Sequence, residues 1–132
     1  MTAPGETDLE AMLASLDVVR RPGTFTYVEV ASAAIAAAEH AHAVVVEDDS
    51  TTLVLTVDDA RRAGLPGELE MAWLTLTVES SLEAVGLTAA FARMLGDVGV
   101  PCNVLAGFRH DHVLVPVDRV DDAMSALRAG TR

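Results

Sequence analysis

Strict alternation of apolar and polar residues predicts the clearest strand of the chain, at residues 71–79. One side of this strand would carry Leu74, Leu76 and Val78, and the other side Trp73, Thr75 and Thr77. A period of two places alternate side chains on opposite faces of a sheet, so the leucine side is predicted to face the core. Residues 24–30, T-F-T-Y-V-E-V, are rich in β-branched and aromatic residues and predict a second strand.

Two pairs of short apolar runs predict β-hairpins. The runs at 42–47 and 52–57 flank the turn residues D-D-S, and the runs at 102–108 and 112–117 flank R-H-D. Short strand-forming runs separated by such turn residues are typical of two antiparallel strands. Each half of the chain is therefore predicted to contain one hairpin.

A helical period replaces the alternation after residue 86. Apolar residues recur there at steps of three and four, at Leu87, Ala90, Phe91, Met94, Leu95 and Val98. That spacing predicts an amphipathic helix packed on the sheet, and Gly99 followed by Pro101 supplies its stop signal. Four shorter helices are predicted at 7–16 behind a Thr7 and Glu10 capping box, at 31–40 in an alanine-rich run, at 57–64 ending in Gly64, and at 118–128 behind an Asp118 cap.

The tetrapeptide V-D-D-A occurs at residues 57–60 and again at 120–123, each time just after a hairpin. Both halves also follow the order strand, helix, hairpin, helix, which indicates an internal duplication. Each half is predicted to be a ferredoxin-like βαββαβ unit, so the fold class is α+β, with an antiparallel sheet and helices on one face. We assign residues 1–67, with the N-terminal helix, to the first half and 68–132 to the second, and we expect one folded unit because neither half could bury its core well alone.

Composition and charge narrow the range of partners. The 132 residues are 51% hydrophobic but only 4% aromatic, which predicts a globular core of Ala, Val and Leu. The formal charge of -11 would repel a phosphate backbone or an anionic lipid surface, so neither nucleic acid nor a membrane is expected as a partner. The sequence shows neither a membrane-spanning run nor a signal-peptide pattern, and a cytoplasmic location is expected. Cys102 cannot form an internal disulfide and is interpreted as an inert, buried thiol.

Residues 80–117, from S-S-L-E-A-V-G-L to D-H-V-L-V-P-V, resemble an ACT domain of the branch found in small bacterial tandem-ACT proteins. The resemblance covers residues 72–128, where Gly86, the G-V-P turn and Asn103 stand in the family's order, and it is weaker over 24–64. It implies a pair of ACT modules that sense a small molecule, most often an amino acid, and that associate as dimers. Many ACT domains carry an Asp or Lys followed by Pro-Gly where the first strand meets the helix, whereas the stretch from Ser80 to Gly86 contains no such proline.

The turn after Val78 is the predicted ligand site. A helix N-terminus offers backbone N–H groups and partial positive charge to an anion such as a carboxylate, so Ser80, Ser81 and Leu82 are candidate ligand contacts. A capping box of Ser80 with Glu83 is the purely structural alternative. From the resemblance, Asn103 and Val104 would lie beside this turn, where the Asn103 amide can both donate to and accept from an amino acid. Asn103 could instead only close the G-V-P turn.

The remaining polar and aromatic candidates have ordinary alternatives. The histidines form two H-x-H pairs, His40 with His42 and His110 with His112, and two rings on one strand face could hold a metal if the pairs met. Hairpin-turn histidines are the ordinary explanation, although His110 is predicted to border the ligand site. Trp73 could be a ligand shelf, or could be buried by a second sheet or a dimer partner.

These features favour a regulatory, ligand-binding protein without catalytic activity. No nucleophile with an oriented base, no phosphate-binding glycine loop and no cofactor motif is present in the sequence, so no cofactor and no metal are expected. An amino acid is the expected ligand and a homodimer the expected assembly. Two other functions stay open: a protein interaction module without a ligand, and a metal-dependent enzyme using the histidine pairs.

Overall fold

The computed structural model describes residues 9–31, 38–78 and 85–130. The chain divides into two compact units, which we call unit 1 (Met1–Pro22 with Ala72–Arg132) and unit 2 (Gly23–Met71). The N-terminal segment therefore belongs to the same unit as the second half of the sequence. The predicted boundary between residues 67 and 68 had instead assigned this segment to the first half.

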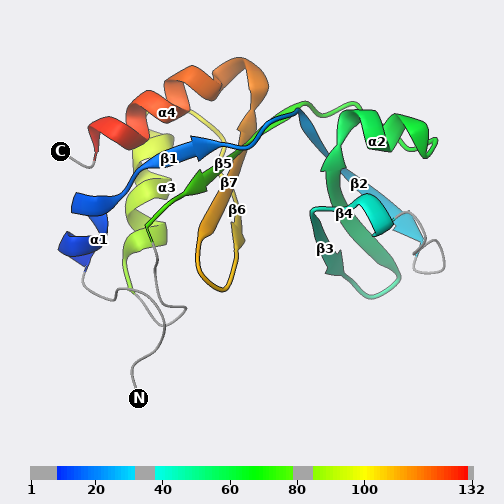
Figure 1. The fold of residues 1–132 in the computed structure, drawn as a ribbon, viewed down its shortest axis with the longest axis horizontal. Coiled ribbons are helices and arrows are strands. Elements are labelled where there is room, and N and C mark those ends of the chain that lie inside the picture. The colour runs from blue at the N-terminus through cyan, green and yellow to red at the C-terminus, as the bar shows by residue number, and fades with distance from the viewer. Residues whose placement is uncertain (1–8, 32–37, 79–84, 131–132) are drawn as a thin grey trace. The chain divides into compact units, whose positions relative to one another are not determined.

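The described residues of unit 1 form four strands in the order β1-β5-β7-β6 (Figure 1). They are β1 (Val18–Arg20), β5 (Met71–Leu76, whose first residue belongs to unit 2), β6 (Asn103–Ala106) and β7 (Asp111–Pro116). The β6–β7 pair is the predicted hairpin. β1 was not predicted, and it pairs antiparallel with β5 from Val18 opposite Leu76 to Arg20 opposite Leu74. A strand from the N-terminal segment therefore completes the ferredoxin-like sheet of this unit.

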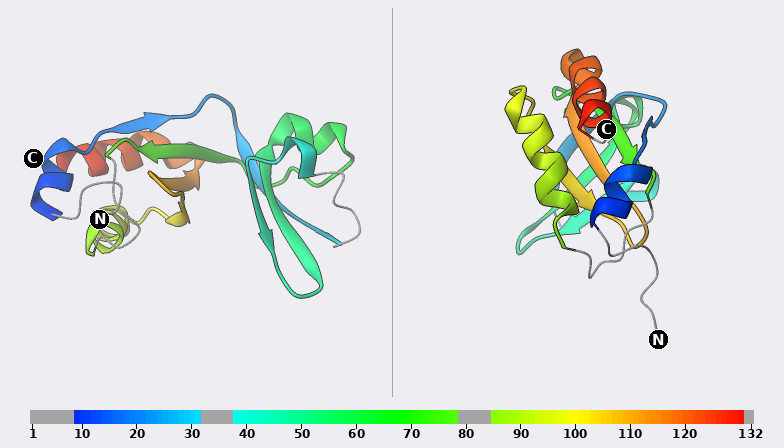
Figure 2. Two further views of the ribbon diagram at one scale, coloured as in Figure 1. Left: turned by 60° about the horizontal axis from the view of Figure 1, so that its bottom comes forward. Right: turned by 90° about the vertical axis from the view of Figure 1, so that its left-hand side faces the viewer.

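The helices of unit 1 cover one face of its sheet. They are α1 (Leu9–Ser15), α3 (Leu87–Asp97) and α4 (Val120–Ala129), and α3 lies beside α4 (Figure 2). All three contribute to one core with Ala72, Leu74 and Leu76 of β5, as Met12, Phe91 and Leu127 show by being fully buried. The predicted inward face of the strand is confirmed.

Two details at the helix ends of unit 1 differ from the prediction. Val98 is 44% exposed and Val100 is buried instead, because α3 ends at Asp97 and the chain reverses at Gly99, whose φ is 72°. Asp118 does not cap α4: it lies in a 3-10 turn, Val117–Arg119, and α4 begins after Arg119 without a side-chain cap.

In the described part of unit 2, three antiparallel strands lie in the order β3-β4-β2, at Ala43–Val46, Ser50–Thr56 and Phe25–Ala31. Helix α2 (Val57–Arg62) follows β4, and the chain turns at Gly64, as predicted from its glycine stop. Met71 pairs with Phe25 at the end of the unit. The core consists of Val28, Val30, Leu53, Leu55 and Ala60.

The alanine-rich helix predicted at 31–40 falls largely outside the described residues, and 38–40 form a 3-10 turn. Within the described ranges, no helix is both long and apolar enough to cross a membrane. The fold class is α+β, as predicted, with ferredoxin-like modules in tandem.

Candidate functional site

The serines of the predicted ligand turn, Ser80 and Ser81, lie with Leu82 outside the described residues. The flanking residues are described: Val78 is buried after β5, and α3 begins at Leu87 with Gly86 as its N-cap. Gly86 has a φ of 99°, a conformation that favours glycine, and a Cβ there would lie 3.0 Å from Cδ2 of Leu9. The N-terminus of α3 is therefore downstream of the two serines.

Asn103 and Val104 are the first two residues of β6, and the pleat points them to opposite faces of the sheet. The exposed Asn103 donates from Nδ2 to the carbonyl oxygen of Leu114, its cross-strand partner, at 3.3 Å. Val104 packs against the core of unit 1 on the helix side. The Asn103 amide thus ties β6 to β7 rather than only closing the preceding turn.

His110 lies at the other end of the same hairpin. Its carbonyl oxygen accepts the backbone N–H of Gly107 at 2.9 Å and so closes the β6–β7 turn. The register runs from Asn103 opposite Leu114 to Ala106 opposite Asp111, which places His110 beyond the last pair. The hairpin therefore separates Asn103 from His110 instead of bringing them together, and ligand binding by either residue stays a prediction.

A polar and aromatic cluster occupies the helix-free face of unit 1. His112 of β7 accepts at Nδ1 from Trp73 Nε1, 3.2 Å away, and the Thr75 hydroxyl lies 2.9 Å from the same nitrogen. The guanidinium of Arg21 stacks over the Trp73 ring at 4.0 Å from its centroid. Only 3% of Trp73 is exposed, and Arg21 already covers a face of its ring, which argues against a ligand shelf.

The hydrogen bonds fix the protonation of His112. An indole N–H can only donate, so Nδ1 of His112 is an acceptor and the ring proton sits on Nε2. Burial lowers the pKa of His112, and the positive charges of Arg21 and His110 lower it further. A Cβ at Gly107 would lie 3.2 Å from Nε2, so this glycine leaves room for the ring under the turn. His112 is thus a neutral, positioned acceptor.

The structure does not place either histidine pair on one strand. His110 lies in a turn before β7, and His42 precedes β3 with its ring edge against Phe25, at 4.9 Å between centroids. Among the described residues, no three His, Cys, Asp or Glu side chains are grouped so that they could hold a metal ion. Cys102 is half-buried against the core, and burial raises the pKa of its thiol.

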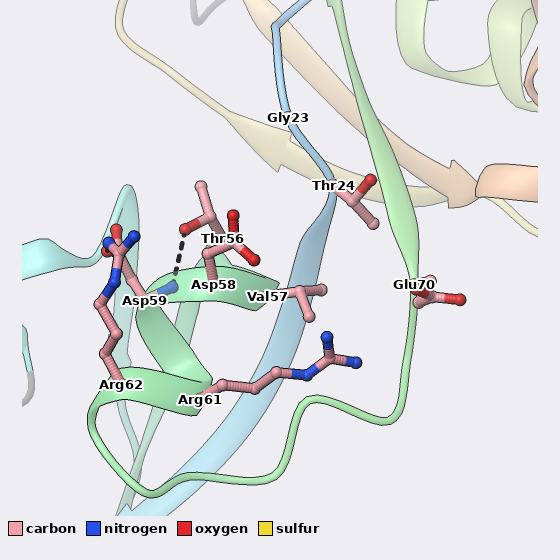
Figure 3. A pocket seen from close by; sticks show the side chains of 9 residues that line it. All are labelled: Gly23, Thr24, Thr56, Val57, Asp58, Asp59, Arg61, Arg62 and Glu70. Carbon is pink, nitrogen blue, oxygen red and sulfur yellow. Dashed lines mark hydrogen bonds and ion pairs between the residues drawn. The ribbon is translucent and has the colours of Figure 1, made fainter.

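A cavity of about 540 Å³ opens beside α2 in unit 2 (Figure 3). Its polar lining comes from Thr24, Thr56, Asp58, Asp59, Arg61, Arg62 and Glu70. The Thr56 hydroxyl accepts the backbone N–H of Asp59 at 3.1 Å, and Arg62 pairs with the Asp59 carboxylate at 3.2 Å.

Among the charged side chains that line this cavity, Arg61 and Asp58, like Glu70, form no ion pair with another described residue. Arg61 leaves α2 on a different side from Arg62 (Figure 3), and its stem lies against Gly67, where a Cβ would be 3.6 Å from Arg61 Cγ. Within the described part of the chain, neither the Arg61 guanidinium nor the Asp58 carboxylate has a hydrogen-bond or ion-pair partner. The cavity can therefore offer both signs of charge to one small ligand.

Sequence reasoning missed this cavity because V-D-D-A was considered only as a sign of internal duplication. The hydroxyl of Thr24, the β4 end at Thr56 and the loop residue Glu70 meet only in the folded unit. The one signal in the sequence was the mixed charge of D-D-A-R-R. A second cavity, of about 520 Å³, is more apolar and is lined in unit 1 by Leu9, Ala90, Met94 and Gly130 among others.

Several solved structures resemble this chain. A protein of unknown function from Vibrio cholerae, described as a possible transport protein, is 36% identical over 94% of this chain and 96% of its own, with a TM-score of 0.82. A protein from Agrobacterium tumefaciens is 17% identical, covers 88% of this chain and 89% of its own, and has a TM-score of 0.72. The regulatory subunit of aspartate kinase from Thermus flavus is 10% identical, covers 88% and 97%, and has a TM-score of 0.69. The last two likenesses show the fold alone.

The sequence also matches models of a known protein family. No curated protein matches the chain. Two models of the ACT domain match in tandem, over residues 4–72 and 68–129, and the first alone spans just over half of the chain. The chain therefore belongs to the ACT-domain family.

Proposed function

We propose that this protein is a non-catalytic regulator that binds a small amino acid and acts as a homodimer. Membership of the ACT family indicates a regulatory, ligand-binding role, and the observation that carries the proposal is the tandem match over residues 4–129. The likeness to aspartate kinase regulatory subunits supports it, because those proteins have the same fold in a regulatory subunit. An effector acts by preferring one conformation or one assembly of the protein.

Two places in the chain suit an amino acid. The turn after Val78 stays the proposed primary site, with Ser80, Ser81 and Leu82 as candidate contacts and Asn103 nearby in the family's arrangement. The cavity beside α2 is the alternative, because Arg61 can pair with a carboxylate and Asp58 with an ammonium group. The two places lie in different units, so point substitutions in each unit can show which of the two binds the ligand.

The test is a thermal-shift screen of the full chain against single amino acids at millimolar concentration. A ligand that binds only the native state stabilises it by about 2.7 kcal/mol at a hundredfold excess over its dissociation constant. Loss of a selective shift in Ser80→Ala, Ser81→Ala or Asn103→Ala would place the site at the turn. Loss only in Asp58→Asn and Arg61→Gln would place it beside α2, and Arg20→Gln, at an exposed arginine of unit 1, is the matched control.

The absence of any shift in the well-folded protein would contradict ligand binding. The second candidate function would then lead, that of an interaction module without a ligand. The observation that favours it is the exposed apolar strand β3, in which Val46 is 75% exposed.

A further inference from the structure

A cavity of about 520 Å³ lies among the described helices of unit 1. Helix α3 supplies its longest wall, and α1 lies against α3 (Figure 1). The chain just after α4 reaches the cavity at Gly130. Pockets for small molecules have volumes of about 300–1,000 Å³ and are mostly apolar, with a few polar groups that orient the ligand. This cavity therefore has the size of a small-molecule site.

One side of α3 packs in the core and the adjacent side lines the cavity. Leu87, Phe91 and Leu95 are buried in the core of the unit. The residues that line the cavity recur at steps of one and three, at Gly86, Ala89, Ala90, Arg93, Met94 and Asp97. Residues three and four apart are neighbours on a helix surface, so these positions share one side of α3.

The cavity is apolar where α1 meets α3. Leu9 of α1 packs so closely over Gly86 that a Cβ on this glycine would lie 3.0 Å from Leu9 Cδ2. Met94 packs in the same way against Gly130, where a Cβ would overlap the methionine sulfur. Ala90 lies one turn of α3 from each of these two contacts and contributes only a methyl group. The space between the contacts can therefore receive an aliphatic group.

Arg93 and Asp97 bring opposite charges to the same cavity. They lie four residues apart on α3, with about 5–6 Å between their Cβ atoms. A base that precedes an acid is the less favourable order for pairing along a helix. Within the described ranges, neither side chain has an ion-pair or hydrogen-bond partner. Both charges are thus open to a ligand.

We propose that this cavity binds an α-amino acid with an aliphatic side chain. The carboxylate of the ligand pairs with the Arg93 guanidinium and its ammonium group with the Asp97 carboxylate, while its side chain lies beside Ala90. The inference rests on the amino-acid binding proposed above, and it adds a third place and a chemical class of ligand to the two places named there.

Charge argues against a fatty acid as the occupant. A lone carboxylate would leave Asp97 unpaired and would add negative charge to a chain whose formal charge is already -11. An amino acid is neutral overall and offers one group to each of the two charged side chains.

L-Leucine is the probe for this class, and isothermal titration calorimetry of the full chain measures its dissociation constant. Two analogues each remove one charged group: 4-methylpentanoate lacks the ammonium group, and 3-methylbutylamine lacks the carboxylate. Each analogue loses one charge-assisted contact, so each is expected to bind at least about tenfold more weakly than leucine.

Two charge substitutions test which group of the ligand each residue binds. Arg93→Gln should weaken leucine binding about tenfold and leave the affinity for 3-methylbutylamine unchanged. Asp97→Asn should weaken leucine binding by a similar factor without weakening 4-methylpentanoate. Arg20→Gln, at an exposed arginine outside this cavity, is the matched control. Equal weakening of all three probes in either variant would overturn the assigned contacts.

A larger side chain at position 90 tests the apolar part. Ala90→Leu should abolish leucine binding, because the added group fills the space beside α1, and leucine is nearly as good a helix former as alanine. Ala92→Leu adds the same group to the same helix outside the cavity lining and should retain the wild-type dissociation constant. Circular dichroism establishes that both variants are folded.

The outcomes separate this inference from the proposed function. A wild type that does not bind leucine, equal affinity for 4-methylpentanoate, or leucine binding unchanged by Ala90→Leu would each overturn the site. If another amino acid stabilises the wild type and Ala90→Leu equally in the thermal-shift screen, the regulator stands and this site fails. No stabilisation by any amino acid would contradict both.

Discussion

The two V-D-D-A helices begin with the same residues and end differently. In unit 2, α2 stops at Arg62 and buries Val57 and Ala60. In unit 1, α4 continues to Ala129 and adds Leu127, fully buried, to a core that three helices share. A common start therefore does not determine length: Gly64 ends α2 early, whereas apolar residues at helical spacing extend α4. The longer helix should contribute more to stability.

Removal of the Leu127 side chain tests this most strongly. Leu127→Ala should lower the free energy of unfolding by about 2–5 kcal/mol, because the site is fully buried and a cavity would remain. Leu69→Ala, at a 55% exposed leucine of unit 2, is the control and should change stability little. The measurement is urea unfolding followed by circular dichroism, and equal losses in the two variants would contradict the comparison.

The helix starts differ in capping. Thr56→Ala should cost about 1 kcal/mol, because the hydroxyl of Thr56 accepts the Asp59 N–H at the start of α2. Asp118→Ala should be nearly neutral, since Asp118 lies in the 3-10 turn before α4 and makes no cap. Thermal unfolding of the two variants compares them directly, and a larger loss for Asp118→Ala would restore the capping role predicted from the sequence.

Among the described residues, unit 2 contains a buried polar side-chain atom without a hydrogen-bond partner. Thr26 is fully buried, and within the described part of the chain its hydroxyl oxygen has no hydrogen-bond partner. Thr26→Val should raise the free energy of unfolding by about 1 kcal/mol, because it removes an unsatisfied polar group. Thr51→Val, at the other buried threonine, is the comparison; a destabilised Thr26→Val would indicate a partner for this hydroxyl.

The half-buried His112 of unit 1 has the smallest expected effect. The pKa of His112 is lower in the folded protein than the usual value of about 6.5, so only the unfolded state takes up the proton as pH falls below that value. The stabilisation is complete above about pH 6.5 and is lost below it. His112→Asn, whose amide oxygen can replace Nδ1 as acceptor, should show a smaller loss of stability between about pH 7.5 and about pH 5.5.

Local patterns predicted most of the elements. Both hairpins, the alternation of β5 and the stops at Gly64 and Gly99 were legible because each depends on a few neighbouring residues. β1 was not, since three residues are too few to show a period and the strand forms only by pairing with a segment more than fifty residues away.

The site was less predictable for the same reason. Trp73 and His112 are 39 residues apart, and no local sequence pattern predicts the hydrogen bond between them. The cavity beside α2 likewise depends on how a strand end and a loop meet. The predicted ligand contacts Ser80, Ser81 and Leu82 stay predictions, and so does the role of Asn103.

The contribution of β1 to unit 1 has a consequence for synthesis on the ribosome. Chains emerge from the N-terminus at about 5–20 residues per second, and domains generally fold as units. Val18–Arg20 emerge early but cannot pair until Leu74–Leu76 have emerged, whereas the strands of unit 2 are all available by then. We therefore expect unit 2 to fold first, and the N-terminal segment to be the part of the nascent chain that a chaperone would need to hold.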